Sequence, residues 1–105
     1  MPDLTAALNQ LWIRFLPEIR ERVAILEAAA QARVAGVLTS EHREAAHAAA
    51  HKLAGTLGTF SLARGTDLAR EFEQACESDE SCAAAEAQRL IALAAEIRAV
   101  IDGRN

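Results

Sequence analysis

The sequence predicts an all-α fold, an antiparallel up-and-down four-helix bundle with an additional N-terminal helix. Alanine, the strongest helix former, accounts for 25 of the 105 residues. Apolar residues recur every three or four positions along most of the chain, which is the period of an amphipathic helix, and no segment alternates as a β-strand does. Because the connections between the predicted helices are short, consecutive helices are expected to be antiparallel neighbours.

The first predicted helix covers residues 3–16, and Asp3 is placed to cap its start. Its apolar residues fall on one side at helical spacing: Leu4, Leu8, Leu11, Trp12 and Phe15. Proline lacks the N–H that a helix interior requires, so Pro17 either opens a new helix or kinks a continuous one. The pattern leaves both options open, and we assign residues 17–35 to a separate helix that Gly36 ends.

Three further helices are expected over residues 39–58, 61–77 and 82–101. The first of these starts with hydroxyl residues and has an acid in its first turn, both of which favour a helix N-terminus. A polar turn over residues 78–81 separates the other two, and Gly103 is expected to end the last helix.

A chain of this length supports one domain with a single modest core. A self-contained ATP-using enzyme would not fit. The net charge is −4 and the pI about 5.3, and no cluster of Lys and Arg marks a surface for nucleic acid. No stretch approaches the roughly 20 apolar residues that span a bilayer. We expect a monomeric, cytoplasmic protein with neither a nucleic-acid nor a membrane partner.

One histidine lies on the wrong side of its helix for a core residue. At about 100° per residue, the side opposite His51 is occupied by apolar residues. These are Ala46, Ala49, Leu53 and Leu57. His51 is therefore expected to face solvent. Gly55 and Gly58 fall on its own side, one and two turns further on, so the helix shows no side chain there.

Each glycine inside a helix costs about 1 kcal/mol relative to alanine. One interpretation is that the bare strip lets another protein's surface come close to His51. The other is that Gly58 only ends the helix and Gly55 only lets a neighbouring helix pack closely. The spacing leaves both interpretations open.

A family resemblance is carried by residues 46–60, which read AHAAAHKLAGTLGTF. They resemble the signature of histidine-containing phosphotransfer domains, an Ala-rich approach followed by His-x-Leu-Lys-Gly and a return helix rich in Leu and acid. The resemblance implies a four-helix bundle with an extra N-terminal helix. It makes His51 the phosphoacceptor, through the ring nitrogen farther from the backbone, and Gly55 the clearance for a receiver domain. The ungapped match brings Glu73 to the position where the family often has a Gln that holds the histidine ring.

The sequence departs from the family pattern at one position. The family's Lys, three residues after the histidine and thought to steady the phosphoryl oxygens, is Ala54 here. Lys52 lies about 100° round the helix, and its long side chain is one candidate replacement. Arg64 and Arg70 on the next predicted helix are further candidates.

The resemblance implies a phosphocarrier in a two-component phosphorelay, without catalytic or ATP-binding machinery of its own, so we do not expect an enzyme. His51 would take a phosphoryl group from the aspartyl phosphate of a response-regulator receiver domain, or from a hybrid histidine kinase, and pass it on. Phosphoryl transfer needs a divalent metal and cations. This chain has no carboxylate cluster for Mg²⁺, so the receiver is expected to supply the ion, and no cofactor is expected here. The docking surface is expected around His51, with a rim of His47, Ala48, Ala54 and Thr59, and with Trp12 or Phe15 at its border.

Two other functions fit parts of the pattern. His47 and His51 are spaced i, i+4, with Glu44 three residues before His47, which is also how a helix presents ligands to a metal ion. A helical adaptor that binds partners without phosphorylation is the second alternative.

The two cysteines of the chain, Cys76 and Cys82, are six positions apart. This spacing matches neither a zinc nor a redox motif, and we interpret them as reduced thiols.

Overall fold

The computed structural model describes residues 4–77 and 84–104 and shows helices but no strand in these ranges. The helices are α1 (Leu4–Val34), α2 (Ser40–Thr59), α3 (Ala63–Ala75) and α4 (Ala84–Arg104). The all-helical fold is thereby confirmed. None of these helices, as far as they are described, is long and apolar enough to cross a membrane.

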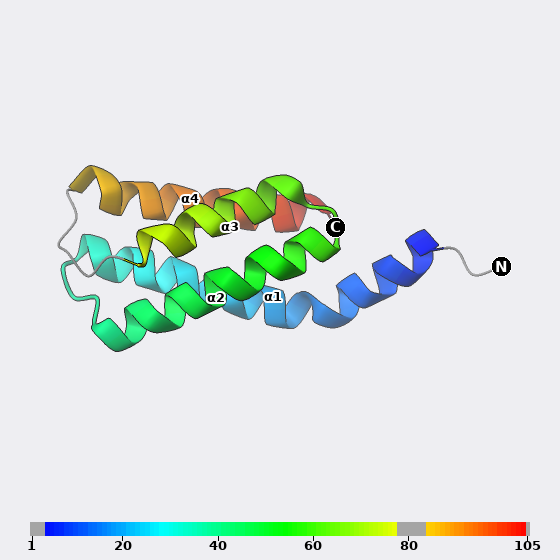
Figure 1. Ribbon diagram of the computed structural model, residues 1–105, viewed down its shortest axis with the longest axis horizontal. Helices are drawn as coiled ribbons and strands as arrows, with labels where there is room; N and C mark the ends of the chain where they lie inside the picture. The colour runs from blue at the N-terminus through cyan, green and yellow to red at the C-terminus, as the bar shows by residue number, and fades with distance from the viewer. Residues whose placement is uncertain (1–3, 78–83, 105) are drawn as a thin grey trace.

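The four helices lie along the long axis of an elongated molecule with extents of 54 × 22 × 17 Å. Figure 1 shows that the chain reverses direction between α1 and α2 and again between α2 and α3. Each helix packs against its neighbour in chain order, and α4 closes the bundle against α1. The bundle therefore has one side on which α2 and α3 meet and another on which α1 and α4 meet.

The division of the N-terminal region into two helices, residues 3–16 and 17–35, is wrong: α1 is one helix with Pro17 inside it. The apolar patterns before and after the proline are in phase, so a single helix buries both of them. Their buried members are Trp12, Ile19, Val23, Leu26, Ala29 and Ala30. Pro17 cannot donate to the carbonyl of Ile13, but Ile13 is 68% exposed, so water can meet that oxygen.

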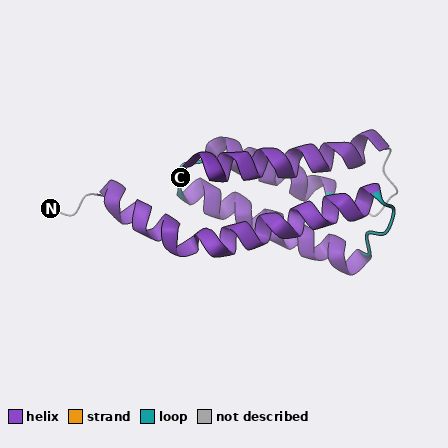
Figure 2. Cartoon of the chain, turned by 180° about the vertical axis from the view of Figure 1, so that it is seen from behind, coloured by secondary structure: helices purple, strands orange, loops and turns teal. Residues whose placement is uncertain are grey.

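The proline is the physical cause of a bend that Figures 1 and 2 both show in α1. The N-terminal part of the helix extends past the ends of the other three helices (Figure 2). Large apolar side chains in this part are consequently exposed, among them Leu4, Leu11, Ile13 and Phe15.

The loop between α1 and α2 has the helix-ending glycine and the capping hydroxyl that the sequence predicts. Gly36 has a φ of +74°, and the Val37 N–H donates to the carbonyl of Ala32 at 2.9 Å, which closes the end of α1. The Thr39 hydroxyl accepts from the backbone N–H of His42 at 3.1 Å and caps α2.

The ends of α3 and α4 differ from the expected bounds. Ser61 takes a φ of +60°, which no helix interior adopts, so α3 begins only at Ala63. Gly103 does not end α4, which continues to Arg104. The guanidinium of Arg104 lies 4.9 Å from the centre of the Trp12 ring and also donates to the Asn9 side chain, and these contacts hold the last turn. Asp3, the turn over residues 78–81 and Cys82 lie outside the described residues.

The core consists of apolar side chains from all four helices. Leu53 and Leu57 of α2 and Phe72 of α3 are fully buried. Gly65 allows α3 to come close to α2 and α4, because a Cβ there would lie 2.9 Å from Leu57 Cδ1 and 3.1 Å from Val100 Cγ1. This close approach brings the polar edges of α2 and α3 within reach of each other.

Candidate functional site

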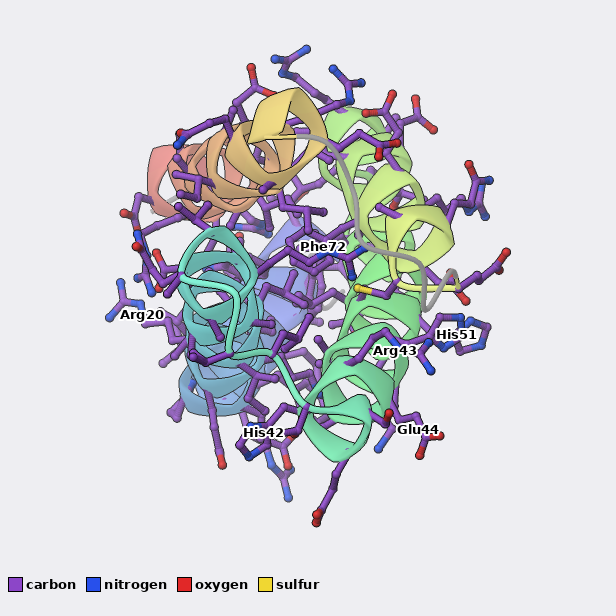
Figure 3. All side chains as sticks on the ribbon, turned by 90° about the vertical axis from the view of Figure 1, so that its left-hand side faces the viewer. Arg20, His42, Arg43, Glu44, His51 and Phe72 are labelled. Atoms are coloured by element: carbon purple, nitrogen blue, oxygen red, sulfur yellow. The ribbon has the colours of Figure 1, made fainter. Side chains whose placement is uncertain are left out.

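His51 lies in the middle of α2, with its side chain 74% exposed. Leu53 and Leu57 point the other way and are fully buried, as the helical spacing predicts. Figure 3 shows the contrast, because the His51 side chain points away from the bundle while Phe72 lies between the helices. The imidazole is therefore accessible from solvent on a rigid helix that the core holds in place.

The hydrogen bond between His51 and Glu73 defines the site. Glu73 comes from α3, is only 18% exposed and places Oε2 at 2.9 Å from His51 Nδ1. A carboxylate accepts, so Nδ1 is the donor of this bond, and in a neutral ring Nε2 then carries the lone pair, directed away from Glu73. The structure thus brings together the two residues that the family resemblance pairs, and it leaves Nε2 outside this contact.

The two glycines of the strip have different surroundings. A Cβ added at Gly55 would meet no atom within 4 Å, so no neighbouring helix of the bundle needs a glycine there. The interpretation that Gly55 serves helix packing is therefore wrong. A Cβ at Gly58 would lie 3.4 Å from Thr66 Oγ1, so this glycine does lie close to α3. Gly58 does not end α2, which runs on to Thr59.

His47, expected at the rim, is turned toward the acids of α3. Its Nε2 lies 3.8 Å from Glu73 Oε2 and 3.7 Å from Glu77 Oε1. Glu73 therefore faces two imidazoles, with His51 much the closer. Glu77 is not among the residues predicted from the sequence, although its position four residues after Glu73 places both carboxylates on one side of α3.

The other rim residues divide into exposed and buried positions. Ala48 and Thr59 are exposed, and the Thr59 hydroxyl donates to the carbonyl of Gly55 at 3.1 Å. Ala54 is only 6% exposed, and its carbonyl accepts from the Thr66 hydroxyl at 3.0 Å. Assigning Ala54 to an exposed rim is wrong, because this position faces α3.

The candidate cations also differ in their surroundings. Lys52 and Arg70 are exposed, and neither has a carboxylate partner among the residues that the structure describes. Arg64, at the start of α3, lies 3.6 Å from Glu96 of α4 and is directed to a different part of the surface. The structure therefore separates Arg64 from His51.

Of the two aromatic residues considered for the border, only Phe15 is accessible. Trp12 is 2% exposed and packs edge-on against Phe60, with ring centres 5.1 Å apart. Phe15 is 40% exposed and Leu11 is 41% exposed on the same helix. Trp12 is a core residue, whereas Phe15 and Leu11 present apolar surface to solvent.

The described residues do not support the metal-site alternative. Among them, no group of three or more His, Cys, Asp or Glu side chains converges in a way that could hold a metal ion. The imidazoles of His47 and His51 turn toward Glu73 of α3. Among the described residues, Glu44 forms no hydrogen bond or ion pair with either ring. Burial raises the pKa of the Cys76 thiol to about 11, so this residue stays protonated and a poor nucleophile at neutral pH.

Comparisons with known proteins identify the family of this chain. The family model described as the Hpt domain matches residues 10–103. One curated relative, Protein RcaC of Microchaete diplosiphon, is 37% identical over 68 residues, which cover 65% of this chain and 10% of that protein. The chain thus spans about a tenth of the length of this relative, and no solved structure matches it significantly. Since the family model covers nearly the whole chain, the protein belongs to the Hpt domain family, the histidine-containing phosphotransfer domains.

Proposed function

We propose that His51 is the residue on which this Hpt domain carries a phosphoryl group. Histidine phosphotransfer within a phosphorelay is the function of the family. The hydrogen bond between His51 Nδ1 and Glu73 is the observation that supports the assignment most directly, because it orients an otherwise exposed ring and leaves Nε2 available. His42 and His47 lack this combination of an exposed ring and a close carboxylate.

The chemistry of the step follows from the tautomer. The lone pair of His51 Nε2 attacks the phosphorus of an aspartyl phosphate, and a nitrogen–phosphorus bond forms. The bond from phosphorus to the aspartate oxygen breaks, and its electron pair stays on the carboxylate. The ring keeps its proton on Nδ1 and becomes positively charged, so the Glu73 carboxylate at 2.9 Å stabilises the product. Transfer onward reverses these steps.

We further propose that the partner is a receiver domain, which brings the reactive aspartate and its Mg²⁺. The surface beside His51 suits such a partner, because Gly55 has open space above it and Thr59 continues the exposed strip. The exposed Phe15 and Leu11 of α1 add apolar area at the same end of the bundle as Phe60. Signalling contacts of this kind are usually small and transient.

In this proposal the chain is a phosphocarrier, with neither ATP binding nor self-phosphorylation of its own. A hybrid histidine kinase is a second source of the phosphoryl group. A monomeric state and a cytoplasmic location remain predictions from the sequence.

The test is phosphoryl transfer from a receiver domain that has been phosphorylated with a small phosphodonor and Mg²⁺. The chain should take up phosphate that is labile in acid and stable in base, as expected of phosphohistidine. His51→Gln should take up none, whereas His42→Gln, a matched change on the same helix, should behave as the wild type. Label on His51→Gln at the wild-type level would refute the assignment.

A further inference from the structure

The phosphoryl group on His51 needs a cation that the expected position does not provide. A phosphohistidine places up to two negative charges beside the Glu73 carboxylate, and phosphoryl transfer depends on neutralising such charge. Ala54 stands where the family has its lysine, and it is buried with its carbonyl bonded to Thr66. If this chain supplies a cation of its own, that cation comes from another position.

The contacts between α2 and α3 show which α3 residues face His51. Thr66 bonds to the carbonyl of Ala54, and Glu73 bonds to the ring of His51. Residue numbers rise along α3 as they fall along α2, so the two helices are antiparallel here. Thr66 and Glu73 are seven residues apart, which places them two turns apart on the same face of α3.

Arg70 occupies the turn between these two contacts. It lies four residues after Thr66 and three before Glu73, so it shares their face of α3. Because Thr66 and Glu73 bracket it, Arg70 lies on the Gly55 side of His51 along the two helices. Arg70 is exposed, so its long side chain can reach across the edge of α2.

The competing cations are less well placed. Arg64 is six residues, about 1.7 turns, before Arg70 and pairs with Glu96 of α4 at 3.6 Å. Lys52 is about 100° from His51 around α2, in the direction opposite to Ala54, the residue that meets α3. No carboxylate in the described ranges forms an ion pair with Arg70, so its guanidinium needs no rearrangement of an existing bridge to bind phosphate.

We propose that Arg70 binds the phosphoryl oxygens on His51, in place of the lysine that Ala54 replaces. This inference rests on the proposed role of His51. The guanidinium presents several N–H donors in a planar fork that matches two phosphoryl oxygens at once. Arg70 thus offsets the negative charge of Glu73 on one side of the phosphoryl group, while Glu73 holds the ring on the other.

The experiment compares Arg70→Ala, Arg70→Lys and the matched control Arg64→Ala, each loaded from the phosphorylated receiver. Arg70→Ala should still take up label, because His51 and Glu73 are intact, but its uptake and its transfer back should be about tenfold slower. Arg70→Lys should recover part of this loss, and Arg64→Ala should stay within about twofold of the wild type. A tenfold decrease in the transfer rate is about the effect expected from the loss of one charge-assisted hydrogen bond.

A second readout separates phosphate binding from a structural effect. A neighbouring guanidinium favours the dianionic phosphoryl group, so the pKa followed by phosphorus NMR on the loaded protein should be higher in Arg70→Ala than in Arg64→Ala. Equal titration curves and equal transfer rates in these two variants would overturn the assignment of Arg70. A wild-type chain that takes up no label would instead refute the role of His51.

Discussion

The charged groups on the two sides of the bundle are arranged in opposite ways. Where α1 meets α4, they pair with each other: Arg98 donates to both oxygens of Glu27 at 2.7 and 2.6 Å. Arg20 lies 3.8 Å from Asp102 on the same side. These pairs join the first helix to the last, and they leave little charge for an incoming molecule.

Where α2 meets α3, polar groups instead converge on one exposed ring. Glu73 is shared between His51 and His47, and Arg70 has no carboxylate partner in the described part of the chain. Gly55 adds open space beside the ring. Paired charges thus lie on the side that joins the first helix to the last. Incompletely paired charges and a missing side chain lie on the side that we propose to react.

The largest expected effect comes from filling the open space. Gly55→Leu should lower the rate of transfer from a receiver domain about a hundredfold, the equivalent of roughly 3 kcal/mol lost from docking. The same change should raise the free energy of unfolding by about 0.8 kcal/mol, because leucine is the better helix former. Transfer assays should show the lower rate, and urea unfolding should show the higher stability.

Gly103→Leu is the matched control for Gly55→Leu. A Cβ at Gly103 also meets nothing within 4 Å, but this glycine lies at the end of α4, beside the α1 contacts. Transfer to Gly103→Leu should equal that of the wild type. If both glycine variants transferred equally well, the α2 strip would have no role in docking.

Glu73 and Glu27 both accept hydrogen bonds from another helix, but they should differ in what they support. Glu73→Ala should slow uptake of the phosphoryl group by about tenfold to a hundredfold, since a bond to a charged group contributes roughly 1.5–3 kcal/mol. Glu73→Gln should recover part of the rate, because its amide oxygen still accepts from Nδ1. Unfolding should change little, since the His51 ring is mostly exposed.

Glu27→Ala on the other side should show the reverse. The side chains of Glu27 and Arg98 are each more than a third exposed, so the loss of unfolding free energy should be at most about 1 kcal/mol. Uptake of phosphate should be unchanged. Equal effects of Glu73→Ala and Glu27→Ala on uptake would remove the distinction between the two sides.

The parts of the fold and site that the sequence predicted rest on periodicity and on local motifs. The orientation of His51, the buried Leu53 and Leu57, and the closing role of Gly36 all follow from spacing within one helix. The pairing of Glu73 with His51 needed the family resemblance, because 22 residues separate them in the sequence. Spacing within a helix carries no information about which α3 residue meets which α2 residue.

The failures of prediction have the same origin. Pro17 breaks a local rule, yet α1 continues because the apolar residues on both sides of it enter one core. The burial of Ala54 and the division between Arg64 and Arg70 depend on how α3 is placed against α2 and α4. These outcomes are tertiary, and one sequence does not contain the register between helices.

The smallest expected effect is a pH dependence of stability from the α1–α4 side. The hydrogen bond from Arg98 lowers the pKa of Glu27 from its ordinary value of 4.5, against the opposing effect of burial. Because the folded protein holds the proton less tightly than the unfolded chain, this stabilisation is present above pH 4.5 and is lost as the pH falls through the folded-state pKa. Below pH 4.5, the urea concentration at the unfolding midpoint should therefore fall more steeply with pH in the wild type than in Glu27→Gln. The control Glu18→Gln, at an exposed position of the same helix, should show the same pH dependence as the wild type. If the pH dependence of Glu27→Gln were parallel to that of Glu18→Gln, the pair of Glu27 and Arg98 would contribute nothing to stability.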